Sequence, residues 1–383
     1  MRFSIRSIAI VLLTVSVISI CWYLSSRSFA AAVPPPETGT EEALIGFAEV
    51  RPIDAHTHVF KNDPAFQAFL GRMRLTLLDI LVVDDTAAYA KKLEPQRTDA
   101  LAVVRRSEGH VALCTTFDPY KLANPDFAAQ AIKGIDEDFA QGAVAVKLWK
   151  NLGMEIKRAG GAFLMPDDSI LEPIYKDIAE HHHTIVAHLA EPDACWEPPI
   201  PDDQSYLGVL RGYVAPYYTH NPEWYMYMHP DHPSKQAILA ARDHLLEMNP
   251  HLRVVGAHLG SMETDVNEIA KRLDKYPNFA VESGGRTFYL MLQPREKVRA
   301  FLIKYQDRIL YGTDLQIPAT EDIQGALREW ETTYAQDWKF LATDETFQVE
   351  GHEVHGLKLP EGALAKIFHR NAVRWIPGIV AEH

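Results

Sequence analysis

The chain is organised around residues 53–60, which read Ile53-Asp-Ala-His-Thr-His-Val-Phe60. This short apolar run is typical of a buried β-strand. Successive side chains of a strand point to opposite faces, so His56 and His58 share one face and Thr57 points away from them. Two imidazoles on one face at the end of a strand offer two ligands to a metal ion, although the same pair also occurs as ordinary loop histidines. The rest of the chain decides between the two interpretations.

Seven further apolar runs of strand length follow and alternate with helical patterns. The predicted strands are residues 53–58, 77–83, 111–116, 143–148, 184–189, 253–258, 279–283 and 309–313. Apolar spacing of three and four predicts helices over residues 126–139, 170–180, 234–247, 263–275 and 295–305. Eight strands separated by helices indicate an α/β fold with a parallel sheet, and eight strands close a (β/α)8 TIM barrel. A doubly wound open sheet is the alternative, but no glycine-rich phosphate loop follows the first strand.

Two insertions are long for such a barrel. Residues 191–233 follow the fifth strand and are rich in tyrosine, tryptophan and proline. A loop that leaves the C-terminal end of a barrel strand lies over the active-site face, so this insertion is either a lid or an aromatic cluster that only packs on the barrel. Residues 332–360 follow the eighth strand and are predicted to be a surface excursion.

Four more predicted strands end in, or lead directly to, a residue that can bind a metal or move a proton. Lys147 closes Ala-Val-Ala-Val-Lys, His188 closes Thr-Ile-Val-Ala-His, His258 closes Val-Val-Gly-Ala-His, and Asp314 closes Ile-Leu-Tyr-Gly-Thr-Asp. One polar residue at the end of a buried strand is common. If the barrel closes, however, all of these ends meet at one mouth, which is the face that carries the active site in TIM barrels. The shared position favours one metal site.

These stretches resemble the amidohydrolase superfamily, and in particular its amidohydrolase-related branch (family 2). The similar segments are residues 54–58 (Asp-Ala-His-Thr-His), 144–148 (Val-Ala-Val-Lys-Leu), His188 with Glu191-Pro192, 257–261 (Ala-His-Leu-Gly-Ser), 311–314 (Tyr-Gly-Thr-Asp) and 367–374 (Ile-Phe-His-Arg-Asn-Ala-Val-Arg). Together they span residues 50–376 and are specific for the superfamily, though not for a substrate.

The resemblance implies a ligand set for one divalent metal ion, expected to be zinc: His56, His58, His188 and Asp314. His258 is then either a ligand of a second metal or the group that polarises or protonates the substrate. Lys147 is either carbamylated, bridging two metals, or an unmodified structural or substrate contact. We expect one metal and an unmodified Lys147.

Metal-dependent hydrolysis is the chemistry that such a site favours. A metal with an open position makes hydroxide available near neutral pH. Asp314 would accept the proton of the water and deliver it to the leaving group, and His258 would help to polarise the scissile carbonyl. Three residues at the strand ends are candidates for orienting the ligands: Asp54, Thr57 and Thr313.

Substrate contacts are predicted from loop positions alone. Trp149 follows the fourth strand, Arg286 follows the seventh, and Trp196 opens the long insertion. The guanidinium of Arg286 would suit a carboxylate by bidentate hydrogen bonding. The simpler interpretation is that Arg286 is a surface arginine on a glycine-rich turn.

Three classes of function remain open. The favoured one is a metal-dependent hydrolase that acts on an amide, ester or lactone. The second is a metal-dependent decarboxylase of an unsaturated or aromatic carboxylic acid, as in aminocarboxymuconate-semialdehyde decarboxylase of the same branch. The third is a barrel that keeps its metal for structure or binding without catalysis.

Composition and the N-terminus limit the partners and the location. Apolar residues make up 47% and charged residues 23%, which is typical of a globular chain. The net charge of −13 argues against binding to nucleic acid, so the expected partner is a small-molecule substrate, and oligomerisation is left open.

Residues 1–31 carry an arginine-containing start, an apolar run from Ile8 to Leu24 and a small-residue exit. That layout predicts a signal peptide, or an uncleaved membrane anchor, because the apolar run is about as long as a spanning helix. Residues 32–48 are predicted to be a linker and residues 49–383 the barrel. The barrel is expected outside the cytoplasm, periplasmic or secreted, with the N-terminal segment as its one link to a membrane.

Overall fold

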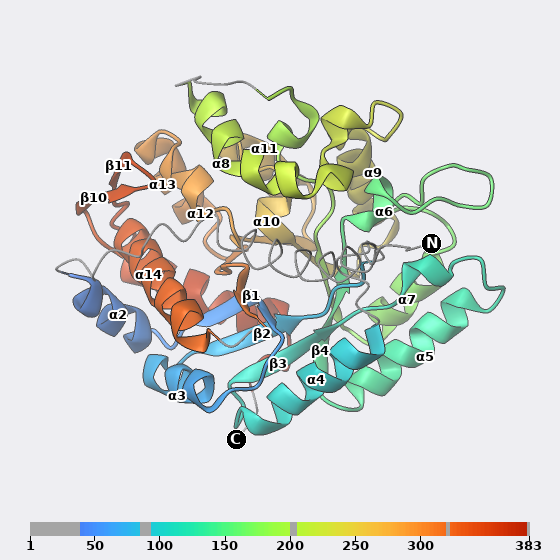
Figure 1. The fold of residues 1–383 in the computed structure, drawn as a ribbon, viewed down its shortest axis with the longest axis horizontal. Helices are drawn as coiled ribbons and strands as arrows, with labels where there is room; N and C mark the ends of the chain where they lie inside the picture. Colours follow the sequence, from blue (N-terminus) through green and yellow to red (C-terminus); the bar gives the residue numbers. More distant parts are fainter. Residues whose placement is uncertain (1–38, 85–92, 200–204, 319–321, 381–383) are drawn as a thin grey trace, which may run out of the picture.

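The computed structural model describes residues 39–84, 93–199, 205–318 and 322–380 (Figure 1). The predicted signal segment, residues 1–31, lies outside this part of the chain. Within the described ranges, no helix is both long enough and apolar enough to cross a membrane.

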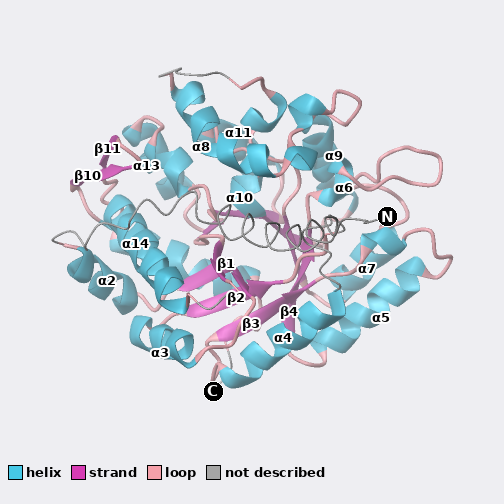
Figure 2. Cartoon of the chain, in the orientation of Figure 1, coloured by secondary structure: helices cyan, strands magenta, loops and turns pink. Residues whose placement is uncertain are grey.

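Nine parallel strands form one sheet at the centre of the molecule, and helices surround them (Figure 2). The strands are β1 (Ile53–Val59), β2 (Thr76–Ile80), β3 (Val111–Thr115), β4 (Ala143–Leu148), β5 (Thr184–Ala187), β6 (Arg253–Gly256), β7 (Phe279–Glu282), β8 (Ile309–Leu310) and β9 (Leu315–Ile317). Their order is β8-β7-β6-β5-β4-β3-β2-β1-β9. All eight predicted strands are therefore present, and β9 is the one strand of this sheet that the sequence did not predict.

The sheet closes on itself because β8 and β9 belong to one continuous stretch. β8 pairs with β7, and a few residues later β9 pairs with β1, where Thr57 lies opposite Leu315. The segment that links β8 to β9 also bonds to β1. The Ala55 amide donates to the Tyr311 carbonyl at 2.9 Å, and the Asp314 amide donates to the His56 carbonyl at 2.8 Å. The structure thus confirms the (β/α)8 barrel and excludes the open sheet.

The barrel interior is filled by small and apolar side chains. One buried cluster takes alternate residues from all eight strands β1–β8: Ile53, Ala55, Leu78, Ile80, Ala112, Cys114, Ala145, Val186, Val255, Ala280 and Leu310. At one end this cluster packs against Trp375 and Ile376, at the end of helix α16 (Asn371–Trp375). The Thr184 hydroxyl at the start of β5 donates to the Trp375 carbonyl, so α16 covers the N-terminal end of the barrel and leaves the C-terminal end for the site.

The helices pack their apolar faces on the outside of the sheet. The five predicted helices are present as α5 (Phe127–Phe139), α7 (Glu172–Glu180), α9 (Lys235–Met248), α11 (Val266–Lys275) and α13 (Arg295–Lys304). The others are α2 (Thr40–Glu49), α3 (Pro64–Met73), α4 (Leu93–Arg106), α6 (Asn151–Met154), α8 (Tyr206–His220), α10 (Ala257–Gly260), α12 (Thr287–Met291), α14 (Ile323–Ala342) and α15 (Glu361–Ala365). Side-chain caps set several helix starts: Ser234 accepts from the Ala237 amide at α9, and Asp265 accepts from the Asn267 amide at α11.

Part of the predicted linker is instead folded. Residues 32–48 were expected to be a tether, but α2 begins at Thr40 and buries Ala43 and Phe47. Phe47 stacks on Tyr334 of α14 with ring centroids 4.6 Å apart, and α2 and α14 lie side by side in Figure 1. The packed part of the chain therefore includes α2, because its apolar face has a partner that lies nearly 300 residues away in sequence.

The prediction that residues 332–360 form a surface excursion is wrong for their first part. Residues up to Ala342 belong to the 20-residue helix α14, which buries Trp330, Tyr334 and Phe340 against the barrel. Only the hairpin of β10 (Thr346–Val349) and β11 (His352–His355) lies largely at the surface. These aromatic residues share one face of the helix, but the charged residues between them concealed this pattern in the sequence.

Replacing Phe340 tests whether α14 belongs to the core. Phe340→Ala should lower the free energy of unfolding by about 3–5 kcal/mol, because the side chain is 2% exposed and leaves a cavity. Chemical denaturation measures the change, with Glu345→Ala on the exposed segment after α14 as the control. Equal stability of Phe340→Ala and the wild type would contradict the placement.

Candidate metal centre

The two histidines of β1 both turn their Nε2 atoms toward the mouth of the barrel. The pairing register between β1 and β2 shifts between Asp54 and Thr57, so a bulge sets the face that the histidines occupy. His56 donates from Nδ1 to Glu282 Oε1 at 2.8 Å, and His58 donates from Nδ1 to the Ile80 carbonyl at 2.8 Å. With their Nδ1 atoms used in this way, both rings present the lone pair of Nε2 to the site.

Asp314 faces these two nitrogen atoms. Its Oδ1 lies 3.2 Å from His58 Nε2 and 3.6 Å from His56 Nε2. About a third of the side chain (32%) remains exposed at the mouth, so this carboxylate can meet both a metal ion and a water molecule.

His258 and His188 form the second half of the cluster. His258 donates from Nδ1 to the Gly284 carbonyl at 2.7 Å, and its Nε2 lies 3.1 Å from His188 Nδ1. The other nitrogen of His188, Nε2, is buried without a hydrogen-bond partner and lies 3.7 Å from Glu191 Oε1. Burial holds the pKa of both imidazoles well below 6.5, so both are neutral.

The backbone that presents His258 is strained. His258, Leu259, Gly260 and Ser261 all have positive φ (59°, 58°, 64° and 56°), which makes the turn after β6 left-handed. Each non-glycine residue in such a turn costs about 1–2 kcal/mol. Three hydrogen bonds hold it: the His258 amide to Glu282 Oε1, buried Arg242 Nη1 to the Gly260 carbonyl, and Ser261 Oγ to the Ala190 carbonyl. Strain retained in this way is typical of functional sites.

The arrangement of lone pairs fits a bound cation. Because His258 Nδ1 faces a carbonyl, its Nε2 carries a lone pair, and that lone pair points at His188 Nδ1. If His188 donates from Nδ1 to His258, its own Nε2 lone pair then faces the Glu191 carboxylate. That arrangement would set a lone pair against a carboxylate. A cation between the two rings removes this repulsion, because both inner nitrogens can bind the cation while His188 Nε2–H faces Glu191.

The structure brings the predicted ligands together to different degrees. One ligand atom from each of His56, His58 and Asp314 lies within 4.8 Å of the others, as a metal site requires. His188 adjoins this group through His258, whose ring lies 4.7 Å from that of His56 between centroids. These residues fit a divalent metal held by imidazole and carboxylate.

Lys147, at the end of β4, occupies the same space. Its Nζ lies 3.2 Å from His56 Nε2, and burial lowers the pKa of Lys147 to about 8. His56 Nε2 cannot accept a hydrogen bond from Lys147 and bind a metal at once. Metal binding therefore requires the amine to turn away from His56.

The residues predicted to orient the ligands differ in what they touch. Asp54 accepts from the His56 amide and from both the amide and the hydroxyl of Thr313, and thereby ties β1 to the residue before Asp314. The Thr57 hydroxyl instead donates to the Leu78 carbonyl on β2.

Sequence reasoning did not assign a role to Glu282 or Glu191 in this site. Glu282 is fully buried under His56, and Glu191 forms a buried ion pair with Lys150. Lys150 Nζ also donates to the Tyr217 hydroxyl at 2.6 Å and lies 4.6 Å from the centre of the Trp224 ring. Glu282 ends an apolar strand, at the same kind of position as the predicted ligands, and this position was the one signal that could have identified it.

Two of the three predicted substrate contacts border the centre. Trp149 and Lys147 share a narrow recess at the ends of β3 and β4. The side chain of Arg286 is only 13% exposed, so the interpretation as a surface arginine is wrong. Trp196 instead donates its indole N–H to the Pro233 carbonyl and joins the two ends of the long insertion.

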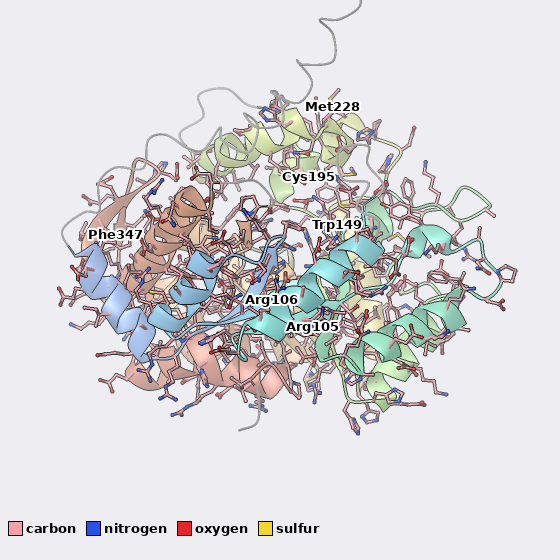
Figure 3. The ribbon with its side chains drawn as sticks, turned by 60° about the horizontal axis from the view of Figure 1, so that its bottom comes forward. Arg105, Arg106, Trp149, Cys195, Met228 and Phe347 are labelled. Atoms are coloured by element: carbon pink, nitrogen blue, oxygen red, sulfur yellow. The ribbon has the colours of Figure 1, made fainter. Side chains whose placement is uncertain are left out.

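The insertion after β5 both packs on the barrel and covers its mouth. It contains η2 (Asp193–Trp196), α8, η3 (Pro222–Trp224) and η4 (Met226–Met228). In Figure 3, Met228 lies at the outer edge of the insertion, whereas Cys195 and Trp149 lie closer to the barrel. The Cys195 thiol donates to the Trp224 carbonyl at 2.9 Å, and Trp224 meets Trp149 edge to face. The lid and the aromatic cluster are therefore the same structure.

The sequence profile of the family described as amidohydrolase matches residues 53–377. The chain belongs to the amidohydrolase family. The protein is thus an enzyme of a metal-dependent superfamily, and its histidine and carboxylate groups are of the kind that holds a divalent metal. A search of curated proteins found no match.

Several solved structures are similar to this chain. An uncharacterised TIM-barrel protein from Bordetella bronchiseptica shares 14% identity at a TM-score of 0.48, over 86% of this chain and 99% of that one. 4-Oxalomesaconate hydratase from Rhodopseudomonas palustris shares 11% at 0.47, over 86% and 96%. Dihydroorotase from Campylobacter jejuni shares 11% at 0.41, over 84% and 82%. The barrel assignment itself rests on the strand pairing described above.

Removing one ligand should empty the centre. His58→Ala is expected to lose most of the metal that the wild type holds, about one ion per chain, because its Nε2 is one of the inner donors. Elemental mass spectrometry of protein purified without added metal measures the content, with the partly buried His352 in β11 replaced by alanine as the control. Unchanged metal in His58→Ala would place the site elsewhere, and two ions per chain would make Lys147 and His258 ligands.

Proposed function

We propose that this protein is a hydrolase that directs a water molecule, at a single divalent metal expected to be zinc, onto an amide, ester or lactone. The observation that carries the proposal is the position of Asp314, whose carboxylate lies 3.2 Å from His58 Nε2 and remains partly open to solvent. A carboxylate that both borders a metal site and reaches water is what a hydrolytic centre needs for proton transfer.

Asp314 and His258 have different roles in the proposed reaction. When bound, a divalent metal supplies Lewis-acid activation of water and of the substrate carbonyl. Asp314 is ionised, so it accepts a proton from the attacking water at the mouth and returns it to the leaving group. Neutral His258, with Nδ1–H committed to Gly284, offers a lone pair at Nε2 and therefore fits a ligand or a proton acceptor better than a donor.

Arg286 adds a positive charge to the wall of the site. It donates from Nη1 to the Gly285 carbonyl, while its buried Nε has no hydrogen-bond partner and lies 4.0 Å from Glu263 Oε2. The guanidinium also lies over the Tyr289 ring at 5.5 Å. A buried arginine with unused donors beside the centre supports a substrate that carries an anionic group, such as a carboxylate.

Product analysis tests the reaction class. Turnover of carboxylate-bearing amides, esters and lactones in oxygen-18 water should place one solvent oxygen in the acid product, because hydrolysis adds water across the cleaved bond. Mass spectrometry of the products measures this. Release of CO₂ from a carboxylated substrate without solvent oxygen in the remaining product would overturn the hydrolase in favour of the decarboxylase.

Replacing Asp314 tests the proton transfer. Asp314→Asn should keep the fold but lower kcat by about 10²–10⁴, because the amide cannot accept the proton. Steady-state kinetics measures the rate, and circular dichroism checks the fold. A wild-type rate in Asp314→Asn would remove the acid–base role from this residue.

Replacing Arg286 tests the charge of the substrate. Arg286→Ala should raise KM for a carboxylate-bearing substrate by about tenfold or more and change KM for its neutral ester analogue little, since only the anion loses a charged hydrogen bond. Arg286→Lys should recover only part of the loss, because lysine lacks the planar fork. Arg72→Ala, at an exposed ion pair with Glu331, is the control. Equal effects on the charged and neutral substrates would contradict this role.

A further inference from the structure

Glu282, the last residue of β7, is a fully enclosed carboxylate near the centre. It is 0% exposed, and its two oxygen atoms accept hydrogen bonds from three donors on different parts of the chain. Oε1 lies 2.8 Å from His56 Nδ1 and 2.8 Å from the backbone amide of His258, and Oε2 accepts from the Gly284 amide. One side chain therefore touches the ring of one histidine and the backbone of another.

Two glycines form a cradle for this carboxylate. A Cβ at Gly284 would lie 2.7 Å from Glu282 Oε2 and 3.2 Å from His56 Cβ, and a Cβ at Gly312 would lie 2.5 Å from Oε2 and 3.2 Å from His56 Cβ. Gly284 follows β7 and Gly312 follows β8, so the loops of two strands leave room at the same point. Any larger residue at either position would push the carboxylate or His56 out of place.

We propose that Glu282, held in the cradle of Gly284 and Gly312, is the positioning residue of the metal centre. Its carboxylate fixes the His56 ring with Nε2 turned toward the metal and holds the strained turn that presents His258. The inference rests on the metal centre of the proposed function, but it does not depend on which reaction the centre performs.

The hydrogen bonds favour positioning over ligation. His56, His258 and Glu282 each offer an atom within 4.8 Å of the others, as a group of ligands would. However, a cation at this place would displace the bonds from His56 Nδ1 to Glu282 and from His258 Nδ1 to Gly284. A carboxylate behind a metal-binding histidine instead fixes its tautomer and strengthens it as a ligand. The same bond from the His258 amide offsets part of the strain in the left-handed turn.

Metal affinity measures the role without any assay of activity. Glu282→Gln keeps the size of the side chain but removes the charge and places an amide N–H₂ among three donors. We expect its affinity for Zn²⁺ to fall about 10- to 100-fold, measured by competition with a chromophoric chelator. The visible absorption of the Co²⁺-loaded protein should change as well, because the orientation of His56 alters the ligand field.

The matched control is Asp337→Asn. Asp337 is a buried carboxylate whose hydrogen bond comes from a tyrosine, the Tyr311 hydroxyl at 2.8 Å, rather than from a histidine. Its replacement should leave the affinity for Zn²⁺ within about twofold of the wild type. An equal loss in Asp337→Asn would mean that any missing buried charge loosens the barrel, and would overturn the proposal.

A second variant disturbs the cradle and keeps the carboxylate. Gly312→Ala should also weaken Zn²⁺ binding, because the new methyl group would meet Glu282 Oε2. Gly71→Ala in α3, where an added Cβ would meet nothing within 4 Å, is its control. Wild-type affinity in both Glu282→Gln and Gly312→Ala would overturn the positioning role alone, whereas a wild-type chain that binds no metal would overturn the metal centre with it.

Discussion

The hydrogen bonds that join the first strand to the last stretch of the sheet are the constraint on which the site depends. The Asp314 amide donates to the His56 carbonyl, and β9 then continues beside β1. These contacts close the barrel and place the carboxylate of Asp314, which lies between β8 and β9, against two histidines of β1. Fold and site are therefore formed together, because the same backbone contacts that complete the sheet bring the ligands within reach of one another.

The site combines strain with buried charge, and the barrel compensates for both. The left-handed turn at His258 and the positive φ of Asp314 are conformations that these residues adopt only when their surroundings hold them. Arg242, Glu282 and Ser261 supply the bonds that do so at His258. The rigid sheet keeps these groups in place, so the ligand set stays assembled.

The insertion after β5 extends this arrangement to the mouth. Tyr217 of α8 reaches the metal cluster indirectly. Its hydroxyl accepts a hydrogen bond from Lys150, and Lys150 pairs with Glu191, which lies beside His188. The cover of the site is thus linked to the metal cluster through a buried ion pair. Because charges buried in this way are costly to separate, the pair holds the insertion close to the ends of β4 and β5.

Much of the barrel could be predicted from local patterns. All eight strands were predicted because buried strands are short apolar runs, and the histidines, Lys147 and Asp314 were identified as candidates because each lies at or just after the end of such a run. β9 was missed because three residues carry little periodicity, and α14 because its buried face is interrupted by charged residues.

The sequence by itself determined eight strands of the barrel and the polar residues at their ends, since these follow from side-chain alternation and apolar run length. Only the tertiary structure decided that Glu282 lies beneath His56, that Arg286 is buried and that α2 packs on α14. Glu282 has its place only because Gly284, Gly312 and His56 meet across a closed barrel. Contacts of that kind join residues from separate strands, and no local pattern contains them.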